Sequence, residues 1–197
     1  MKNIEEIFIK QKGYARMSDL KSEKIHTRSV AKAIENGIIE KVKAGLYKLV
    51  DYPWDEHSSF VDISQSKKSA IICLTSALAY HELSTINPSI VTIAVPQNTD
   101  QFILEYPPVK VYYFSNNVYS LGILEKSTTS GIFRIYDAEK TICDMFRYRN
   151  KLGEDIALEG LKNYLKRQSF DLFKFREYAK KSRVLKIIDP YLKAMLV

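Results

Sequence analysis

The segment spanning residues 38–50 constrains the fold of this chain more than any other feature of the sequence. Two runs rich in β-branched and aromatic residues, 38–42 and 46–50, are joined by Lys43, Ala44 and Gly45. Such runs, joined by a short turn that contains glycine, predict a β-hairpin. The first fifty residues therefore end in a hairpin, and the segments before it decide which class of domain this is.

A helix and a short strand are expected at the start of the chain. Ile4, Ile7 and Phe8 recur at helical spacing and predict a helix over residues 3–12 that stops at Gly13. Residues 14–16 are expected to be extended. Ser18 is then expected to cap a short second helix, because its hydroxyl can accept from the free amides of the first turn.

A third helix is expected directly before the hairpin. Thr27 is expected to cap it, and Val30, Ala31 and Ile34 share one face of the pattern, which ends at the pair Asn36-Gly37. The resulting order is helix, short strand, helix, helix, hairpin. This is the order of a winged helix-turn-helix, whose usual partner is double-stranded DNA.

The expected DNA contacts follow from that assignment. The second helix of the pair enters the major groove, where Arg28 can bind guanine in a bidentate manner and Thr27 or Ser29 can bond to phosphate or base. A tyrosine such as Tyr14 is more often a core residue than a ligand, and a single exposed cation is usually only solvated. The candidate contacts are His26, Thr27, Arg28, Ser29, Lys32, Lys41, Lys43, Arg16 and Tyr14.

The distribution of charge agrees with an anionic partner. The formal net charge is +7, and cations concentrate over residues 24–48 and 162–186. In the second cluster, Lys180, Lys181 and Arg183 form a candidate secondary basic patch. Three interpretations of this patch stay open: contact with the DNA backbone, contact with an RNA or protein partner, and a solvated helix surface.

A change of pattern at residues 51–54 predicts two domains, 1–52 and 53–197. The second is expected to be α+β, a small sheet flanked by helices, whose strand order one sequence does not reveal. A connecting helix with Phe60 and Ile63 on its apolar face comes first. Strands are expected at 71–74, 90–95, 109–114 and 132–136, and helices at 75–83, 137–148, 155–166, 171–181 and 184–196.

The sequence predicts a cytoplasmic protein. Residues 1–12 lack the apolar core of a signal peptide, and no apolar run approaches the roughly 20 residues that span a bilayer. Cys73 and Cys143 lie in apolar runs without metal-ligand spacing, so both are expected to be buried, reduced thiols. We expect no membrane partner and no metal.

An enzyme is the less favoured interpretation. Asp137, Glu139 and Asp144 could form an acidic cluster that binds magnesium, as in a nuclease or nucleotidyltransferase, and Asp137 and Asp144 are spaced to share a helix face. The favoured explanation is structural, with Asp137 as a helix N-cap and Glu139 in the first turn. His81-Glu82 lacks the second histidine of a zinc protease motif, and no phosphate-binding loop or nucleophile elbow is present. We therefore expect no catalytic residue and no cofactor.

Three segments together resemble the AbiEi family of antitoxins and transcriptional regulators of viral defence systems. Residues 37–49 resemble its wing, G-x-[IL]-x-[RK]-[IVL]-x-x-G-[VIL]-Y-x-[IL]. Residues 76–83 resemble its S-A-L-x-x-H-x-L helix. Residues 138–144 resemble its P-E-[RK]-A-L-[LI]-D segment, with Ala138 and Thr141 departing from proline and alanine.

The resemblance implies a DNA-binding repressor that binds inverted repeats upstream of its own operon. It also implies the antitoxin of a type IV toxin-antitoxin system, acting in abortive infection against a nucleotidyltransferase-like toxin that it need not touch. A solitary regulator whose second domain senses a ligand or a protein fits the residues equally well. The sequence does not specify the oligomeric state.

Overall fold

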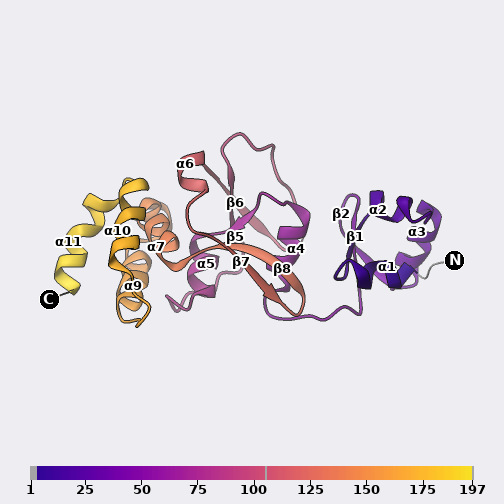
Figure 1. Ribbon diagram of the computed structural model, residues 1–197, viewed down its shortest axis with the longest axis horizontal. Helices are drawn as coiled ribbons and strands as arrows, with labels where there is room; N and C mark the ends of the chain where they lie inside the picture. The colour runs from indigo at the N-terminus through magenta and orange to yellow at the C-terminus, as the bar shows by residue number, and fades with distance from the viewer. Residues whose placement is uncertain (1–3, 105, 197) are drawn as a thin grey trace. The chain divides into compact units, whose positions relative to one another are not determined.

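The computed structural model describes residues 4–104 and 106–196 of the chain. Within them the protein is of the α+β class, as predicted, with eleven helices, a three-stranded antiparallel sheet near the N-terminus and a five-stranded mixed sheet (Figure 1). Asn3, the expected first residue of the first helix, lies outside the described residues.

Contacts along the chain group it into two compact units. Unit 1 comprises Met1–Lys68, Phe102–Pro108 and Lys126–Phe133, and unit 2 comprises the segments between and after them. The expected division after residue 52 therefore falls inside unit 1, at the end of its hairpin. Each unit is described separately below.

The N-terminal elements of unit 1 follow the predicted order. The three strands form a sheet in the order β1-β3-β2, with Tyr14 opposite Lys48 and Ile39 opposite Leu49. Gly45, at a φ of 76°, closes the turn between β2 and β3. The elements are α1 (Ile4–Lys10), β1 (Tyr14–Arg16), α2 (Met17–Ser22), α3 (Thr27–Glu35), β2 (Ile39–Lys43) and β3 (Leu46–Leu49).

The expected caps of α2 and α3 are wrong. Helix α2 begins at Met17, one residue before Ser18, and Oδ2 of Asp19 accepts the Arg16 backbone N–H at 3.1 Å. Helix α3 begins at Thr27 itself, and the preceding His26 makes no side-chain cap bond. Both hydroxyl residues thus lie inside the first turn with helical backbone, and the N-cap positions belong to Arg16 and His26.

The buried face of α3 also differs from the expected one. Val30 and Ala33 are buried, whereas Ala31 is exposed and Ile34 is 39% exposed. Val30 and Ala33, three residues apart, therefore form the buried face, instead of the expected set Val30, Ala31 and Ile34. The expected end of the helix is confirmed, because Gly37 takes the left-handed conformation with a φ of 69°.

One hydrophobic cluster joins all these elements. Gly13 must be glycine, because its φ is 84° and an added Cβ would lie 2.5 Å from the Tyr52 ring. The buried members of the cluster are Ile7, Phe8, Ala15, Leu20, Val30, Ala33, Ile39, Tyr47 and Leu49. Tyr47 thus packs beneath the hairpin.

Helix α4 (Ser58–Ser66) also belongs to unit 1 and contacts β2. Ile63 is buried as expected, together with Val61, and Phe60 is half-buried. Asp62 is buried as well, and it accepts hydrogen bonds from two strands of the sheet. Helix α4 therefore packs on the three-stranded sheet instead of serving only as a connection.

The five-stranded sheet has the order β6-β5-β4-β8-β7, with β5 parallel to β6 and antiparallel to β4, and β4 parallel to β8. The prediction missed β7, whose residues are exposed or half-buried and so lack a clear alternation. The strands are β4 (Ile71–Ile72), β5 (Val91–Pro96), β6 (Val109–Phe114), β7 (Ile123–Thr128) and β8 (Gly131–Tyr136).

The helices of unit 2 pack around a core centred on α7. Both cysteines are buried in this core as free thiols, as predicted, and burial raises the pKa of each. The helices are α5 (Leu74–Tyr80), α6 (Asn116–Tyr119), α7 (Ala138–Arg147), α8 (Arg149–Leu152), α9 (Glu154–Leu165), α10 (Leu172–Lys181) and α11 (Leu185–Met195). No helix among the described residues is long and apolar enough to cross a bilayer.

Candidate nucleic-acid interface

A tight turn between α2 and α3 fixes the direction of α3. The backbone N–H of Ile25 donates to the carbonyl of Leu20 at 2.9 Å, and that of Lys24 donates to Lys21 at 3.0 Å. These two bonds close the end of α2, with Lys24 in the left-handed conformation at a φ of 62°. Ile25 then packs against the core, which holds the first residues of α3 in place.

The outward face of α3 carries the residues predicted to enter the groove. His26, Thr27, Arg28 and Lys32 are exposed, and Ser29 is half-buried. Within the described residues, neither Arg28 nor Lys32 forms an ion pair. The buried Val30 and Ala33 lie on the opposite side of the helix. The helix therefore presents two cations whose charge is not neutralised by any ion pair within residues 4–104 and 106–196.

The two lysines of the hairpin differ in their surroundings. Lys41 is exposed, opposite Tyr47, whereas a β-bulge between Lys41 and Lys43 changes the register before Lys43. The amine of Lys43 lies 6.0 Å from the centre of the Phe102 ring. Partial burial, followed by the charges of Arg16 and Lys67, lowers the pKa of Lys43. Only Lys41 is a freely solvated cation.

The two candidates on β1 contact α4. Tyr14 is only 7% exposed, and its hydroxyl donates to Oδ1 of Asp62 at 2.7 Å. Burial and then the charge of Asp62 raise the pKa of Tyr14. The guanidinium of Arg16 donates to the carbonyl of Gln65 at 2.9 Å. Tyr14 is thus an interior residue, which corrects the expectation that it touches phosphate, and Arg16 is engaged within the protein.

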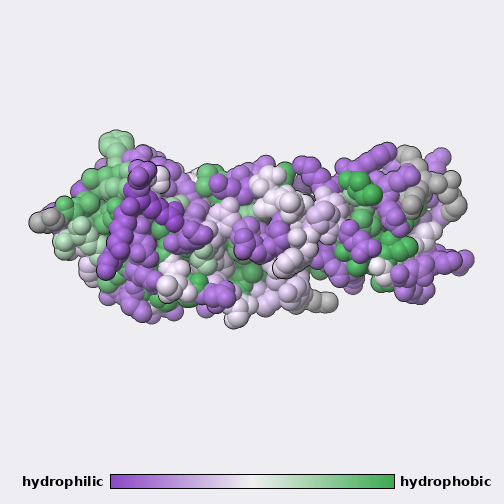
Figure 2. Space-filling model, turned by 90° about the horizontal axis from the view of Figure 1, so that it is seen from below, coloured by the Kyte–Doolittle hydropathy of each residue, from purple (hydrophilic) through white to green (hydrophobic). Residues whose placement is uncertain are grey.

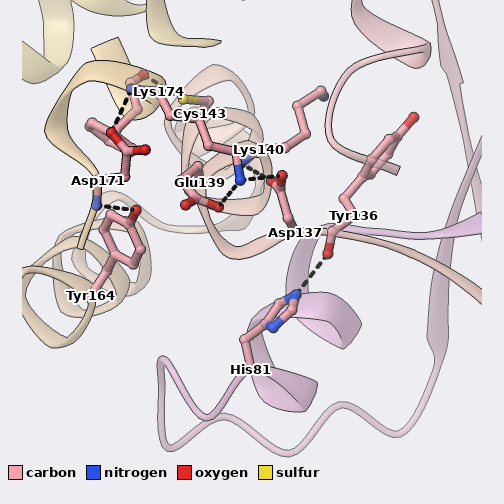
Figure 3. Close-up of polar contacts among 10 residues, drawn as sticks. His81, Tyr136, Asp137, Glu139, Lys140, Cys143, Tyr164, Asp171 and Lys174 are labelled. Atoms are coloured by element: carbon pink, nitrogen blue, oxygen red, sulfur yellow. Dashed lines mark hydrogen bonds and ion pairs between the residues drawn. The ribbon is translucent and has the colours of Figure 1, made fainter. Parts of the chain in front are cut away.

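In unit 2, two of the acidic residues considered as a magnesium site, Asp137 and Glu139, contact lysine residues (Figure 3). Asp137 caps α7, since its Oδ1 accepts the Lys140 backbone N–H at 2.8 Å. The amine of Lys174 lies 3.0 Å from Asp137 and 3.2 Å from Glu139. Burial alone would lower the pKa of Lys174, but the hydrogen bonds and charges of these carboxylates raise it to about 12.

The third acidic residue, Asp144, is fully buried and paired with the equally buried Lys140 one helical turn away. The amine of Lys140 also lies 4.8 Å and 4.5 Å from the ring centres of Phe114 and Tyr136. Burial raises the pKa of Asp144. Among the described residues, no group of three or more histidine, cysteine or carboxylate side chains is arranged to hold a metal ion.

The two segments of unit 2 that carry the family resemblance contact one another. Helix α5 packs against α7, and Nε2 of His81 lies 2.7 Å from the Tyr136 carbonyl, just before α7 (Figure 3). The carbonyl of His81 also accepts from the guanidinium of Arg167, which lies just after the end of α9. The histidine of the first segment therefore has a structural role in joining α5 to the strand that leads into the second segment.

The secondary basic patch lies where α10 meets α11. Lys180, Lys181 and Arg183 are exposed, and Figure 2 shows hydrophilic side chains gathered over the C-terminal helices on the face in view. Lys181 is 2.5 Å from Glu177. Lys181 and Arg183, but not Lys180, line a pocket together with Arg147 and Arg149. The sequence analysis missed these last two arginines, which lie at the end of α7 and the start of α8, because no local pattern there indicates a pocket.

Comparisons of the chain with models of known protein families and with curated proteins give no significant match.

Proposed function

We propose that the elements α1 to β3 form a winged helix-turn-helix that binds double-stranded DNA. The observation that carries the proposal is the outward face of α3, where Arg28 and Lys32 are exposed and form no ion pair with any residue that the structure describes. The preceding turn and the core hold this helix rigidly, as a groove-reading helix requires. The order of the elements, with a hairpin directly after α3, supports the same interpretation.

Each exposed residue then has a role that its chemistry suits. Arg28 reads a guanine through two parallel hydrogen bonds, and Lys32 follows one turn later along the groove. The amides at the start of α3 favour a phosphate there, beside His26, Thr27 and Ser29. Lys41 contacts the DNA backbone from the wing. Lys43, Arg16 and Tyr14 support the wing against α4 and the residue 102 segment.

The biological role that we propose is that of a repressor and antitoxin. The three resembling segments support a regulator that binds inverted repeats in front of its own operon. They also support neutralisation of a nucleotidyltransferase-like toxin by unit 2, which need not touch the toxin. Packing of α5 against α7 supports treating the second and third segments as one structural motif.

Binding of the full chain to its own upstream DNA tests the proposal. The titration is made against random duplex of equal length at two salt concentrations. A specific repressor binds the upstream fragment at least ~10³-fold more tightly, with a steep dependence on salt. Equal, weak binding to both DNAs would reject the groove-reading role of α3. Variants of unit 2 test the antitoxin role separately. They should fail to neutralise the toxin in cells while they still bind DNA as the wild type does.

A further inference from the structure

A pocket of about 570 Å³ in unit 2 is lined by cations from separate elements. Arg147 ends α7, Arg149 begins α8, and Lys181 and Arg183 flank the junction between α10 and α11. Asn117 of α6 adds an amide to the wall. None of the described residues that line the pocket is acidic. Cations that converge on one concave site produce a strong positive potential inside it.

The protein neutralises this charge only in part. Lys181 contacts Glu177, and Arg149 lies 3.7 Å from Glu154, but neither carboxylate is part of the lining. Within the described residues, Arg147 and Arg183 form no ion pair. The guanidinium of Arg147 instead lies 5.8 Å from the centre of the Phe114 ring. Two arginines are thus left with their donors available to a ligand.

Ser182 provides a second, independent observation. It lines the same pocket and is only 4% exposed, yet its hydroxyl has no hydrogen-bond partner within the described residues. Buried polar atoms are almost always satisfied in folded proteins, and this hydroxyl is therefore a donor still without an acceptor at the wall of the pocket. Anionic oxygen is the acceptor that Ser182 and the neighbouring arginines would share.

We propose that this pocket binds a phosphorylated small molecule with at least two negative charges. Its volume falls within the range of small-molecule sites, and its cations converge from several helices instead of following a line along the surface. Ile187 supplies an apolar wall for the uncharged part of the ligand. The inference goes beyond the DNA-binding proposal and does not depend on it.

Calorimetric titration of the full chain with inorganic pyrophosphate tests the proposal directly. We expect saturable binding at one site. Arg183→Gly removes a guanidinium at a residue whose φ of 59° suits glycine, so the fold is preserved. This variant and Arg147→Gln should each weaken pyrophosphate binding roughly tenfold or more, as expected for a lost charge-assisted hydrogen bond. Lys180→Gln is the matched control, because Lys180 is exposed nearby but outside the lining, and it should bind as the wild type does.

Three results would overturn the proposal. The first is no saturable binding of pyrophosphate by the wild-type chain. The second is equal affinity in the wild type, Arg183→Gly and Arg147→Gln. The third is a loss of duplex DNA affinity in these two variants with pyrophosphate binding unchanged, which would make the patch a DNA-backbone surface.

Discussion

The hydroxyl of Tyr14 and the carboxylate of Asp62 form a 2.7 Å hydrogen bond between β1 and α4. Oδ2 of the same carboxylate lies 3.2 Å from the amine of Lys48, so one buried side chain of α4 holds two strands. Tyr14→Phe removes one of the two donors and leaves the ring in place. We expect the free energy of unfolding to fall by about 1–3 kcal/mol, as for a buried acceptor that loses its partner.

Denaturant unfolding measures this loss. Tyr52→Phe is a suitable control, because Tyr52 packs its ring on Gly13 and no hydrogen bond of its hydroxyl is seen within the described residues. An unchanged stability for Tyr14→Phe, with the control also unchanged, would show that the Tyr14–Asp62 bond does not stabilise unit 1.

Arg28→Ala tests the assignment of α3 as the groove-reading helix. Because Arg28 is exposed and has no ion-pair partner in the described part of the chain, its removal should leave the fold intact. We expect operator binding to weaken by roughly 1–3 kcal/mol and sequence preference to relax at one base pair, as for a lost bidentate contact. Titration of the operator and of single-base variants measures both effects. Wild-type binding to all of these DNAs would contradict the assignment.

Lys41→Ala tests the wing. A lysine that contacts phosphate carries no sequence information, so its loss should weaken operator and random duplex alike. The slope of log affinity against log salt should also fall by about one. Lys10→Ala, which removes an exposed lysine at the end of α1, is the control and should change neither quantity. A selective loss of operator binding in Lys41→Ala would mean that Lys41 reads bases.

Mutations of Lys140 and Asp144 should have strongly non-additive effects on the free energy of unfolding. Both side chains are fully buried, so Lys140→Met leaves an uncompensated carboxylate and should destabilise unit 2 by about 3–5 kcal/mol. Combining it with Asp144→Leu removes both charges and should restore most of that loss. The free energies of unfolding of the single and double variants form the test. Additive losses would show that the two charges do not depend on each other.

Lys174 gives an alkaline pH dependence. Its pKa in the folded protein is about 12, above the ordinary value of 10.5, because Asp137 and Glu139 favour the charged amine. Its ion pairs therefore stabilise the fold fully below about pH 10.5, and this contribution is lost as the pH rises through about 12. The stability difference between wild type and Lys174→Met should shrink over that interval. Arginine keeps its charge at this pH, so the stability difference between Lys174→Arg and Lys174→Met should persist over the same interval. If the stability difference between wild type and Lys174→Met does not change with pH, the ion pairs of Lys174 are not its cause.

The local pattern of the sequence was sufficient for most elements of the fold. Apolar periodicity located the main helices, and β6 was predicted at its observed bounds. Strand β7 was missed because it is half-exposed, so its side chains do not alternate clearly. The caps were misplaced because Ser18 and Thr27 are equally acceptable as N-cap or first-turn residues, and only the tertiary structure decides where a short helix begins.

The candidate interface was predictable only where it depends on local structure. The exposure of Arg28 and Lys32 follows from the helical spacing around Val30. The burial of Tyr14 depends on Asp62, forty-eight residues further along the chain, and no pattern in one sequence reports such a contact. The pocket was hidden for the same reason, because Arg147 at the end of α7 and Arg183 in the turn between α10 and α11 line one pocket only through tertiary packing.

The interleaving of the two units limits how this protein can be divided. Unit 1 draws on Phe102–Pro108 and Lys126–Phe133 as well as on the first 68 residues, so neither unit is one continuous stretch of chain. A single protease cut in a connection cannot release either unit whole, and no truncation from one end isolates unit 1. Genetic recombination likewise cannot transfer one unit to another protein without taking part of the other. The two units are therefore expected to be inherited, expressed and degraded together.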